Sequence, residues 1–203
     1  MLAVSGGKGG SGKTTTALGI GTVLAKRRRE PILVDADVDM PNLHIRAGVD
    51  DKGIDRLADG SPVAEAVRES DQFPGIDVAG ARPGAPLERA LRALVTDRPV
   101  VLDGVAGASE KAVTPLRHAD FAVVVTRDTP ASITDAGKTI QMARAVGTPV
   151  VAAIASRASD VSRDISATLP VDTIVPVPAV DDPISHEDAL AAYSRIVDTW
   201  INA

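Results

Sequence analysis

A glycine-rich segment near the N-terminus has the residue types and the spacing that phosphate binding requires. Residues 7–14 read Gly-Lys-Gly-Gly-Ser-Gly-Lys-Thr and fit the pattern G-x-x-x-x-G-K-[ST]. Glycines let successive backbone N–H groups converge on phosphate oxygens. Lys13 would bring a positive charge to the β- and γ-phosphates, and the hydroxyl of Thr14 would be a ligand of Mg²⁺. We therefore expect a nucleoside triphosphate here, with ATP and Mg²⁺ as the ligands.

The surroundings of this segment support the prediction. It lies between an apolar stretch, 1–5, that is typical of a strand and a predicted helix over 14–28. The positive end of the helix dipole would point at the phosphates. A glycine-rich turn that matched by chance would lack this strand–loop–helix context. The loop residues expected to contact the nucleotide are Gly7, Lys8, Gly9, Gly10, Ser11, Gly12, Lys13, Thr14 and Thr15.

Carboxylates occur where two of the predicted strands end. The apolar run 31–35 ends in Asp35, and Asp37 follows two residues later, while the run 100–103 ends in Asp103. Carboxylates just beyond strand ends face the crevice in which open α/β sheets bind ligands. Asp103 would lie near the metal ion and contact it through water. Taken alone, the Asp-x-Asp pair is also typical of a solvated loop.

Strands and helices alternate along the chain. The predicted strands are 1–5, 31–35, 76–79, 100–103, 122–126, 150–155 and 173–176. The predicted helices are 14–28, 87–94, 132–146 and 185–200, and residues 51–72 are interpreted as loop and short helix. This order favours an α/β fold with a doubly wound, mostly parallel sheet and helices on both faces. No linker or repeat interrupts the pattern, so we expect a single domain over residues 1–203.

Composition restricts the partners and the compartment. The 203 residues include 27 acidic and 22 basic side chains, and the net charge of −5 makes nucleic acid an unfavourable bulk partner. The absence of cysteine excludes disulfides, thiolate metal sites and iron–sulfur clusters. No apolar run approaches the ~18 residues that cross a membrane, and no signal peptide precedes the loop, so we expect a cytoplasmic protein. The basic run 26–29 would suit DNA or acidic lipid, but cations are also favoured at a helix C-terminus.

Residues 8–15 read Lys-Gly-Gly-Ser-Gly-Lys-Thr-Thr and resemble the deviant Walker A loop of the MinD/ParA family of P-loop ATPases. Residues 34–43 are similar to the family's D-x-D switch I segment with its trailing P-N-L, and residues 101–107 are similar to its Walker B and switch II segment. The resemblance covers most of the chain. It implies the P-loop NTPase fold and a Mg²⁺-dependent ATP hydrolase that is slow without a partner. It also implies cycling between a monomer and a nucleotide-sandwich homodimer.

The resemblance implies roles for individual residues. Lys8 would reach across the dimer interface to the partner's nucleotide, which makes it catalytic together with Lys13. Spacing alone also fits a solvated loop lysine at this position. Asp37 would orient or deprotonate the attacking water, and Asp35 would support the Mg²⁺ shell beside Asp103.

The chain departs from the family pattern at two positions. Val105 stands where the family usually has proline, although Gly107 would still offer its N–H to the γ-phosphate. Ser156 stands where many relatives place an asparagine that reads adenine, and a hydroxyl cannot make the two-point contact of an amide. Pro176 lies in a segment similar to the family's other base-contacting loop. Asp135 matches an acidic position near the family's dimer face, but an acid in the first turn of a helix is favoured by the dipole in any case.

The output that the resemblance implies is spatial: positioning a cell-division, chromosome or surface-apparatus component, with an unidentified activating protein partner. No basic amphipathic C-terminal extension, the membrane anchor of MinD proteins, is visible. One alternative is an ATP-binding switch that hardly hydrolyses, which Val105 and Ser156 favour. Another is an ATP-dependent amidase or synthetase of cofactor biosynthesis, against which Lys8 argues because those branches often lack that lysine.

Overall fold

A mixed sheet forms the centre of the fold in the computed structural model, which describes residues 1–7, 10–106 and 110–203. Within these residues eight strands are hydrogen-bonded in the order β3-β4-β2-β5-β1-β6-β7-β8. All neighbouring pairs are parallel except β3 and β4. The strands are β1 (Leu2–Gly6), β2 (Ile32–Asp35), β3 (Arg68–Glu69), β4 (Asp77–Ala79), β5 (Val100–Ala106), β6 (Phe121–Arg127), β7 (Val150–Ser156) and β8 (Ile174–Val177).

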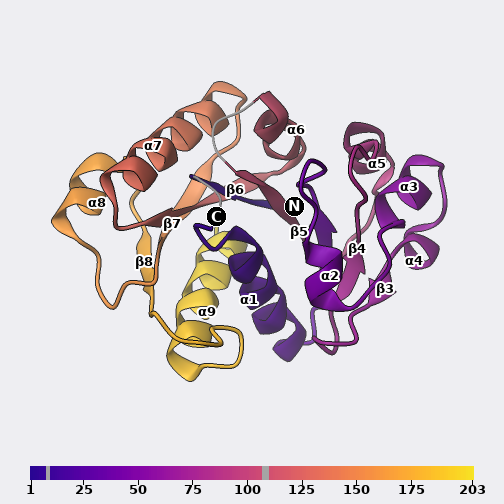
Figure 1. The fold of residues 1–203 in the computed structure, drawn as a ribbon, viewed down its shortest axis with the longest axis horizontal. Helices are drawn as coiled ribbons and strands as arrows, with labels where there is room; N and C mark the ends of the chain where they lie inside the picture. The colour runs from indigo at the N-terminus through magenta and orange to yellow at the C-terminus, as the bar shows by residue number, and fades with distance from the viewer. Residues whose placement is uncertain (8–9, 107–109) are drawn as a thin grey trace.

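Helices cover both faces of this sheet (Figure 1). Alternate residues of β1 point to opposite faces of the sheet. Leu2 and Val4 belong to the hydrophobic core between the sheet and helices α1 and α9, whereas Ala3 belongs to the core on the other face. The helices are α1 (Lys13–Lys26), α2 (Leu43–Ala47), α3 (Gly53–Ala58), α4 (Val63–Ala66), α5 (Leu87–Ala93), α6 (Glu110–His118), α7 (Pro130–Ala145), α8 (Arg163–Thr168) and α9 (Glu187–Ile201). The predicted fold class, doubly wound and mostly parallel, is confirmed.

The strand order places a ligand crevice beside β1. From β1 the chain crosses to β2 on one side, and from β5 it crosses to β6 on the other side of β1. Open α/β sheets bind ligands at the carboxyl ends of strands where the direction of winding changes in this way. The glycine loop leaves β1 at this point.

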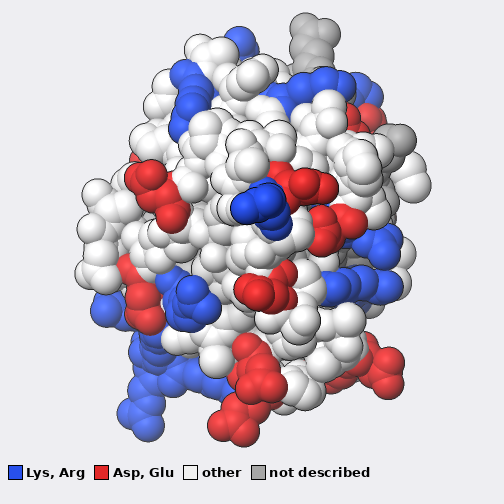
Figure 2. Space-filling view, turned by 90° about the vertical axis from the view of Figure 1, so that its left-hand side faces the viewer, with Lys and Arg blue, Asp and Glu red and all other residues white. Residues whose placement is uncertain are grey.

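Helices α1 and α9 pack side by side (Figure 1), and a glycine permits their close approach. A Cβ on Gly19 would stand 2.3 Å from ring carbons of Tyr193, which is 1% exposed. At the end of α1, Arg27 binds Asp198 of α9 through a 2.7 Å ion pair. One member of the basic run 26–29 therefore stabilises this helix pair. Acidic and basic side chains are interspersed on the face shown in Figure 2.

Several short elements differ from the sequence prediction. Helices α2, α6 and α8 and the antiparallel strand β3 were not predicted, and β5 continues to Ala106, beyond the predicted end at 103. Each of these helices has at most nine residues, which is too few for a clear helical periodicity. Helix α6 also contains Pro115, a residue that normally disfavours a helix interior. Among the helices of the described residues, none has the length and apolarity to span a membrane.

Candidate nucleotide-binding site

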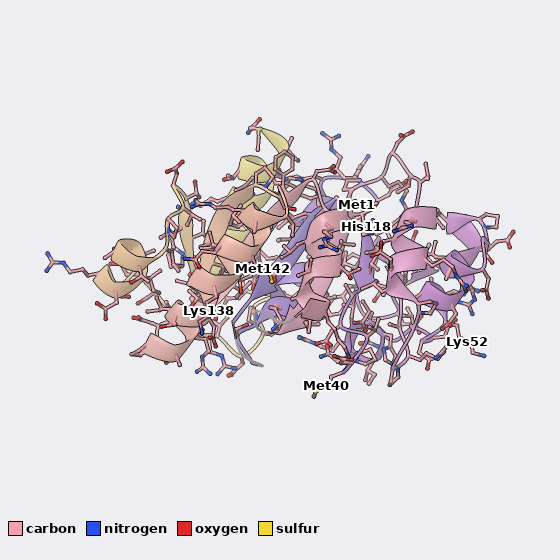
Figure 3. All side chains as sticks on the ribbon, turned by 90° about the horizontal axis from the view of Figure 1, so that it is seen from above. Met1, Met40, Lys52, His118, Lys138 and Met142 are labelled. Carbon is pink, nitrogen blue, oxygen red and sulfur yellow. The ribbon has the colours of Figure 1, made fainter. Side chains whose placement is uncertain are left out.

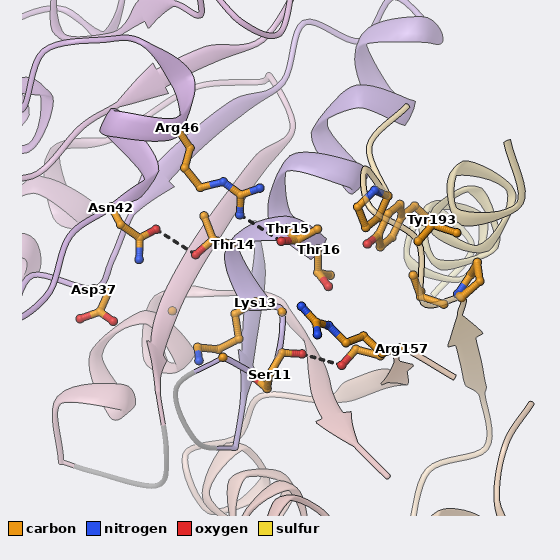
Figure 4. A pocket seen from close by; sticks show the side chains of 18 of the residues that line it. Ser11, Lys13, Thr14, Thr15, Thr16, Asp37, Asn42, Arg46, Arg157 and Tyr193 are labelled. Carbon is orange, nitrogen blue, oxygen red and sulfur yellow. Dashed lines mark hydrogen bonds between the residues drawn. The ribbon is translucent and has the colours of Figure 1, made fainter. Parts of the chain in front are cut away.

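A cavity of about 590 Å³ opens at the carboxyl edge of the sheet, around the N-terminus of α1 (Figure 4). Most of the predicted site residues line it. Those that do are Gly10, Ser11, Gly12, Lys13, Thr14, Thr15, Asp37 and Ser156. Lys8, Gly9 and Gly107 lie outside the described residues. The structure thus brings the loop, the segment that follows β2 and the end of β7 to one cavity.

Glycines shape the described part of the loop. Gly10 and Gly12 have φ angles of +81° and +101°, in the left-handed region that favours glycine. Gly12 is the N-cap of α1, and its carbonyl oxygen accepts a hydrogen bond from the N–H of Thr16 at 2.8 Å. The first N–H groups of α1 therefore lie at the cavity, where the helix dipole favours negative charge. This is the arrangement that an anionic phosphate needs.

Lys13 is the buried cation of the site, at 7% exposure. Burial lowers the pKa of its ammonium group, while the nearby carboxylates of Asp103 and Asp37 raise it. Charge interactions are stronger where water is excluded, so a phosphate placed here would bind Lys13 more firmly than at an exposed surface. Figure 4 shows Asp37 and Lys13 at the same end of the cavity.

Asp35 and Asp103 lie next to each other on neighbouring strands. They are partners in the register of β2 and β5, and they are 0% and 2% exposed. Burial raises the pKa of each carboxyl to about 7; at Asp103 the Thr14 hydroxyl is the largest opposing influence. The Oδ1 atoms of both aspartates have no hydrogen-bond partner among the described residues. Leaving a buried acceptor unpaired is costly, so these two oxygens fit a role in binding a hydrated cation.

Asp35 also holds the start of α2. Its Oδ2 accepts a hydrogen bond from the N–H of Leu43 at 3.0 Å and lies 3.5 Å from Nδ1 of His44. A carboxylate at a helix N-terminus satisfies free N–H groups and complements the dipole. Its predicted place in the Mg²⁺ shell stays a prediction, and the structure adds this positioning role.

The donor set suits Mg²⁺. No cluster of three or more histidine or acidic side chains that would hold a metal by itself occurs within residues 1–7, 10–106 and 110–203. Mg²⁺ is usually held by one or two carboxylates together with substrate phosphates and water. Thr14 and Asp103 offer a hydroxyl and a carboxylate beside the expected phosphates. Bound there, Mg²⁺ would neutralise charge on the phosphate oxygens.

The residues after β2 meet the loop across the cavity. Asp37 lines the cavity, and its Oδ1 accepts a hydrogen bond from the N–H of Met40 at 3.1 Å. The Thr14 hydroxyl donates a hydrogen bond to Oδ1 of Asn42 at 3.1 Å (Figure 4). Asn42 is the middle residue of the P-N-L motif, which does not by itself indicate a role for it. Its bond to the predicted Mg²⁺ ligand shows that this segment and the loop form one site.

The far end of the cavity differs in character. Apolar side chains of Val177, Pro178 and Val180 line it together with polar Arg157 and Asp181. Such a mixture of apolar walls and a few polar groups is typical of a pocket for a base. These residues come from the ends of β7 and β8 and the segment before α9, and sequence reasoning missed the two polar ones because no local motif marks them.

Three residues predicted to contact the nucleotide, Ser156, Pro176 and Gly7, have different positions relative to the cavity. Ser156 lines the cavity, and its Oγ donates a hydrogen bond to the carbonyl oxygen of Ser11 at 2.6 Å. Pro176 pairs with Ala155 inside the sheet and is not part of the lining, whereas the residues that follow it are. Gly7 is also outside the lining, and its N–H donates to the carbonyl oxygen of Val125 at 3.4 Å. Nucleotide contacts by all three stay predictions.

Known proteins resemble the chain over most of its length. Residues 2–178 match the model of the CobQ/CobB/MinD/ParA nucleotide binding domain. An uncharacterised ATP-binding protein of Methanocaldococcus jannaschii is 30% identical over 190 residues, which cover 88% of this chain and 72% of that protein.

Two solved structures show the same fold. The septum site-determining protein MinD of Pyrococcus horikoshii OT3, complexed with Mg-ADP, has a TM-score of 0.77 at 23% identity, covering 98% of this chain and 92% of that one. Cobyrinic acid a,c-diamide synthase of Mycobacterium smegmatis, with bound ADP and magnesium, also has a TM-score of 0.77, at 20% identity, covering 99% and 93%.

The matched segment contains the phosphate loop, the three aspartates and both strands that lead to the base end of the cavity. Sequence motif, sheet topology and cavity therefore agree with the family match. The chain belongs to the family of CobQ/CobB/MinD/ParA nucleotide binding domains, which are P-loop ATPases, and the expected ligands of its cavity are nucleotide and Mg²⁺.

Proposed function

We propose that the protein is a MinD/ParA-like ATPase whose ATP-bound form is a homodimer. The observation that supports this most directly is the position of Asp37. It lies across the cavity from the phosphate loop, near Lys13, on a segment that also presents two large apolar side chains to solvent. Met40 and Ile45 are 76% and 71% exposed, and Met40 projects outward from the fold in Figure 3. Apolar groups beside a reaction site suit a surface that becomes covered when the nucleotide binds.

Hydrolysis is assigned to residues that line the cavity and to Asp35 and Asp103, which are buried in β2 and β5 and are not part of the lining. Backbone N–H groups at the start of α1 and the ammonium of Lys13 would hold the phosphates. Thr14 and Asp103, supported by Asp35, would hold Mg²⁺. The oxygen of the attacking water would bond to the γ-phosphorus while the bond between the γ-phosphorus and the oxygen of the β-phosphate breaks. Asp37 would accept the proton that this water loses.

The dimer, the partner and the cellular role belong to the same proposal. Lys8, by its resemblance to the deviant Walker A lysine, would contact the nucleotide of the second copy and complete the site. An unidentified protein partner would accelerate turnover, and the output would be positioning of a division, chromosome or surface component in the cytoplasm. The similarity to MinD proteins supports this reading. Binding to DNA is not part of it.

Two alternatives share the cavity. In one, the protein binds ATP as a switch and hardly hydrolyses it, which Val105 at the end of β5 favours. In the other, it is an ATP-dependent enzyme of cofactor biosynthesis, which the similarity to cobyrinic acid a,c-diamide synthase favours.

A pair of variants separates these readings. Asp37→Ala should bind ATP, because the phosphate contacts come from Lys13, Thr14 and the backbone, but it should not hydrolyse ATP and should accumulate as a dimer. Lys8→Ala should bind ATP and remain a monomer. Light scattering with Mg-ATP measures the mass of each, and phosphate release measures turnover.

Each alternative has its own outcome. If wild type and Asp37→Ala both stay monomeric with ATP bound, the homodimer proposal fails and the biosynthetic enzyme is favoured. If wild type dimerises but releases no phosphate over hours, the non-hydrolysing switch is favoured. If both variants dimerise equally, Lys8 is a solvated loop lysine.

A further inference from the structure

Arg46 lines the nucleotide cavity next to the first turn of α1. It lies on α2, and its Nη1 donates a hydrogen bond to Oγ1 of Thr15 at 3.0 Å (Figure 4). Thr15 is the third residue of α1, whose first turn binds the phosphates in the proposal above. Neither the motif nor the family match gives Arg46 a role. Arg46 is therefore a cation of the cavity lining that the motif leaves without a function.

The position of Thr15 indicates which part of the nucleotide Arg46 would meet. At one end of the cavity, Thr14 contacts Asn42 near Asp37, where the metal and the terminal phosphate are expected. At the other end are Ser156 and the apolar residues of the base pocket. In Figure 4, Thr15 lies between Asn42 on one side and Tyr193, which also lines the cavity, on the other. The phosphate that joins the ribose to the rest of the chain, the α-phosphate, is the part of a nucleotide that occupies this middle position.

The guanidinium has the donors that such a contact needs. It carries five N–H donors in a planar fork, so the bond to Thr15 leaves donors for phosphate oxygens. Arg46 also lines a second cavity of about 730 Å³ together with Asp182 and Ser185 of the segment before α9. The side chain therefore lies at the boundary of two cavities. Arg46 is exposed, so its side chain has room to turn the fork toward a phosphate.

We propose that Arg46 binds the α-phosphate of the nucleotide held by its own chain and so ties helix α2 to the nucleotide. The contact is present with a diphosphate as well as a triphosphate, because the α-phosphate is common to both. It thus differs from the contacts of Asp37 and Lys13, which concern the terminal phosphates. The same helix is joined to the metal-binding region through Asp35, whose Oδ2 accepts a hydrogen bond from the N–H of Leu43 at the start of α2. This inference rests on the proposed nucleotide-binding function.

Calorimetric titration of the full chain with ATP, ADP and AMP, each with Mg²⁺, tests the proposal. Arg46→Gln should weaken ATP and ADP binding by the same factor, on the order of tenfold for a lost charge-assisted hydrogen bond. AMP should lose affinity by a similar factor. Arg46→Lys, which keeps the charge but not the fork, should lose less. Arg29→Gln is the matched control, because Arg29 is exposed at the end of α1, does not line the cavity, and loses the same charge.

Three outcomes would overturn the assignment: unchanged affinities in Arg46→Gln, a loss confined to ATP, or an equal loss in Arg29→Gln. A loss restricted to ATP would mean that Arg46 contacts the γ-phosphate instead. Thermal unfolding without nucleotide checks the fold, and a partial recovery of affinity in Arg46→Lys cannot come from a purely structural role. If wild type binds ATP and dimerises while Arg46→Gln is normal, only this inference fails. If wild type binds no nucleotide, the proposed function fails with it.

Discussion

The Ser156 hydroxyl donates a hydrogen bond to the carbonyl oxygen of Ser11 at 2.6 Å and so joins the end of β7 to the phosphate loop. A Cβ on Gly12 would stand 3.6 Å from the Cβ of Ser156, which shows how closely the two segments approach. The serine that departs from the family's asparagine thus supports the loop from the base side. The loop conformation depends on a tertiary contact as well as on its glycines.

Replacing Ser156 should therefore weaken nucleotide binding without abolishing it. We expect Ser156→Ala to reduce ATP affinity roughly fivefold, the equivalent of one ordinary hydrogen bond of about 1 kcal/mol. Calorimetric titration with Mg-ATP measures this. Ser166→Ala, which removes an exposed hydroxyl on α8, serves as the control. An affinity equal to that of wild type would mean that the loop keeps its shape without the bond.

Lys13→Ala should abolish nucleotide binding. The side chain is almost completely buried at the cavity, and its charge acts on phosphates in a poorly solvated setting. The loss should amount to several kcal/mol, so titration with a fluorescent ATP analogue should show no saturation. Lys111→Ala is a matched control, since Lys111 is exposed and pairs with Asp39 rather than lining the cavity. Normal affinity in a folded Lys13→Ala protein would refute the phosphate site.

The sheet and the phosphate loop were predictable because their signals are local. Buried parallel strands appear as continuous apolar runs, such as residues 122–125, and the loop motif is contiguous. Helix α2 was missed because its start is stabilised by Asp35, eight residues before Leu43, and not by a capping residue next to it. Nothing in the sequence around residue 43 records that contact.

The base end of the cavity was less predictable for a similar reason. Tyr193 belongs to the buried face of α9, yet it also lines the cavity because α9 packs against α1. Arg157 and Asp181 come together only when β7 and β8 pair. Residues that meet through strand pairing and helix packing leave no spacing in the sequence. The residues at the base end of the cavity could therefore be identified only from the structure.

Asp103→Asn should stabilise the protein in the absence of nucleotide and metal. The carboxylate is buried, and desolvation raises its pKa in the folded protein to about 7, against about 3.9 in an unfolded chain. Between these values the folded state holds the proton more tightly, so ionisation of Asp103 lowers stability as pH rises through this window. The asparagine variant has no such loss. It should also lose Mg²⁺-dependent turnover.

Thermal unfolding in EDTA at pH 5 and pH 8 measures the effect. The midpoint of Asp103→Asn should exceed that of wild type at pH 8, by the equivalent of a few kcal/mol at most, and the difference should shrink at pH 5. A variant that is less stable than wild type at pH 8 would show that attraction between Asp103 and Lys13 outweighs desolvation.

Two helical glycines provide a matched test of the packing between α1 and α9. A Cβ at residue 19 would stand 2.3 Å from the ring of Tyr193, a buried side chain that cannot move aside, whereas a Cβ at Gly137 of α7 would meet no atom within 4 Å. Gly19→Ala should therefore lower the free energy of unfolding by roughly 1–3 kcal/mol, because overpacking exceeds the gain in helix propensity. Gly137→Ala should raise it by up to about 1 kcal/mol.

Because Tyr193 also lines the cavity, Gly19→Ala should weaken ATP binding, whereas Gly137→Ala should not. Urea unfolding and ATP titration of both variants measure these effects, and equal stabilities would mean that α9 shifts away from α1 at little cost.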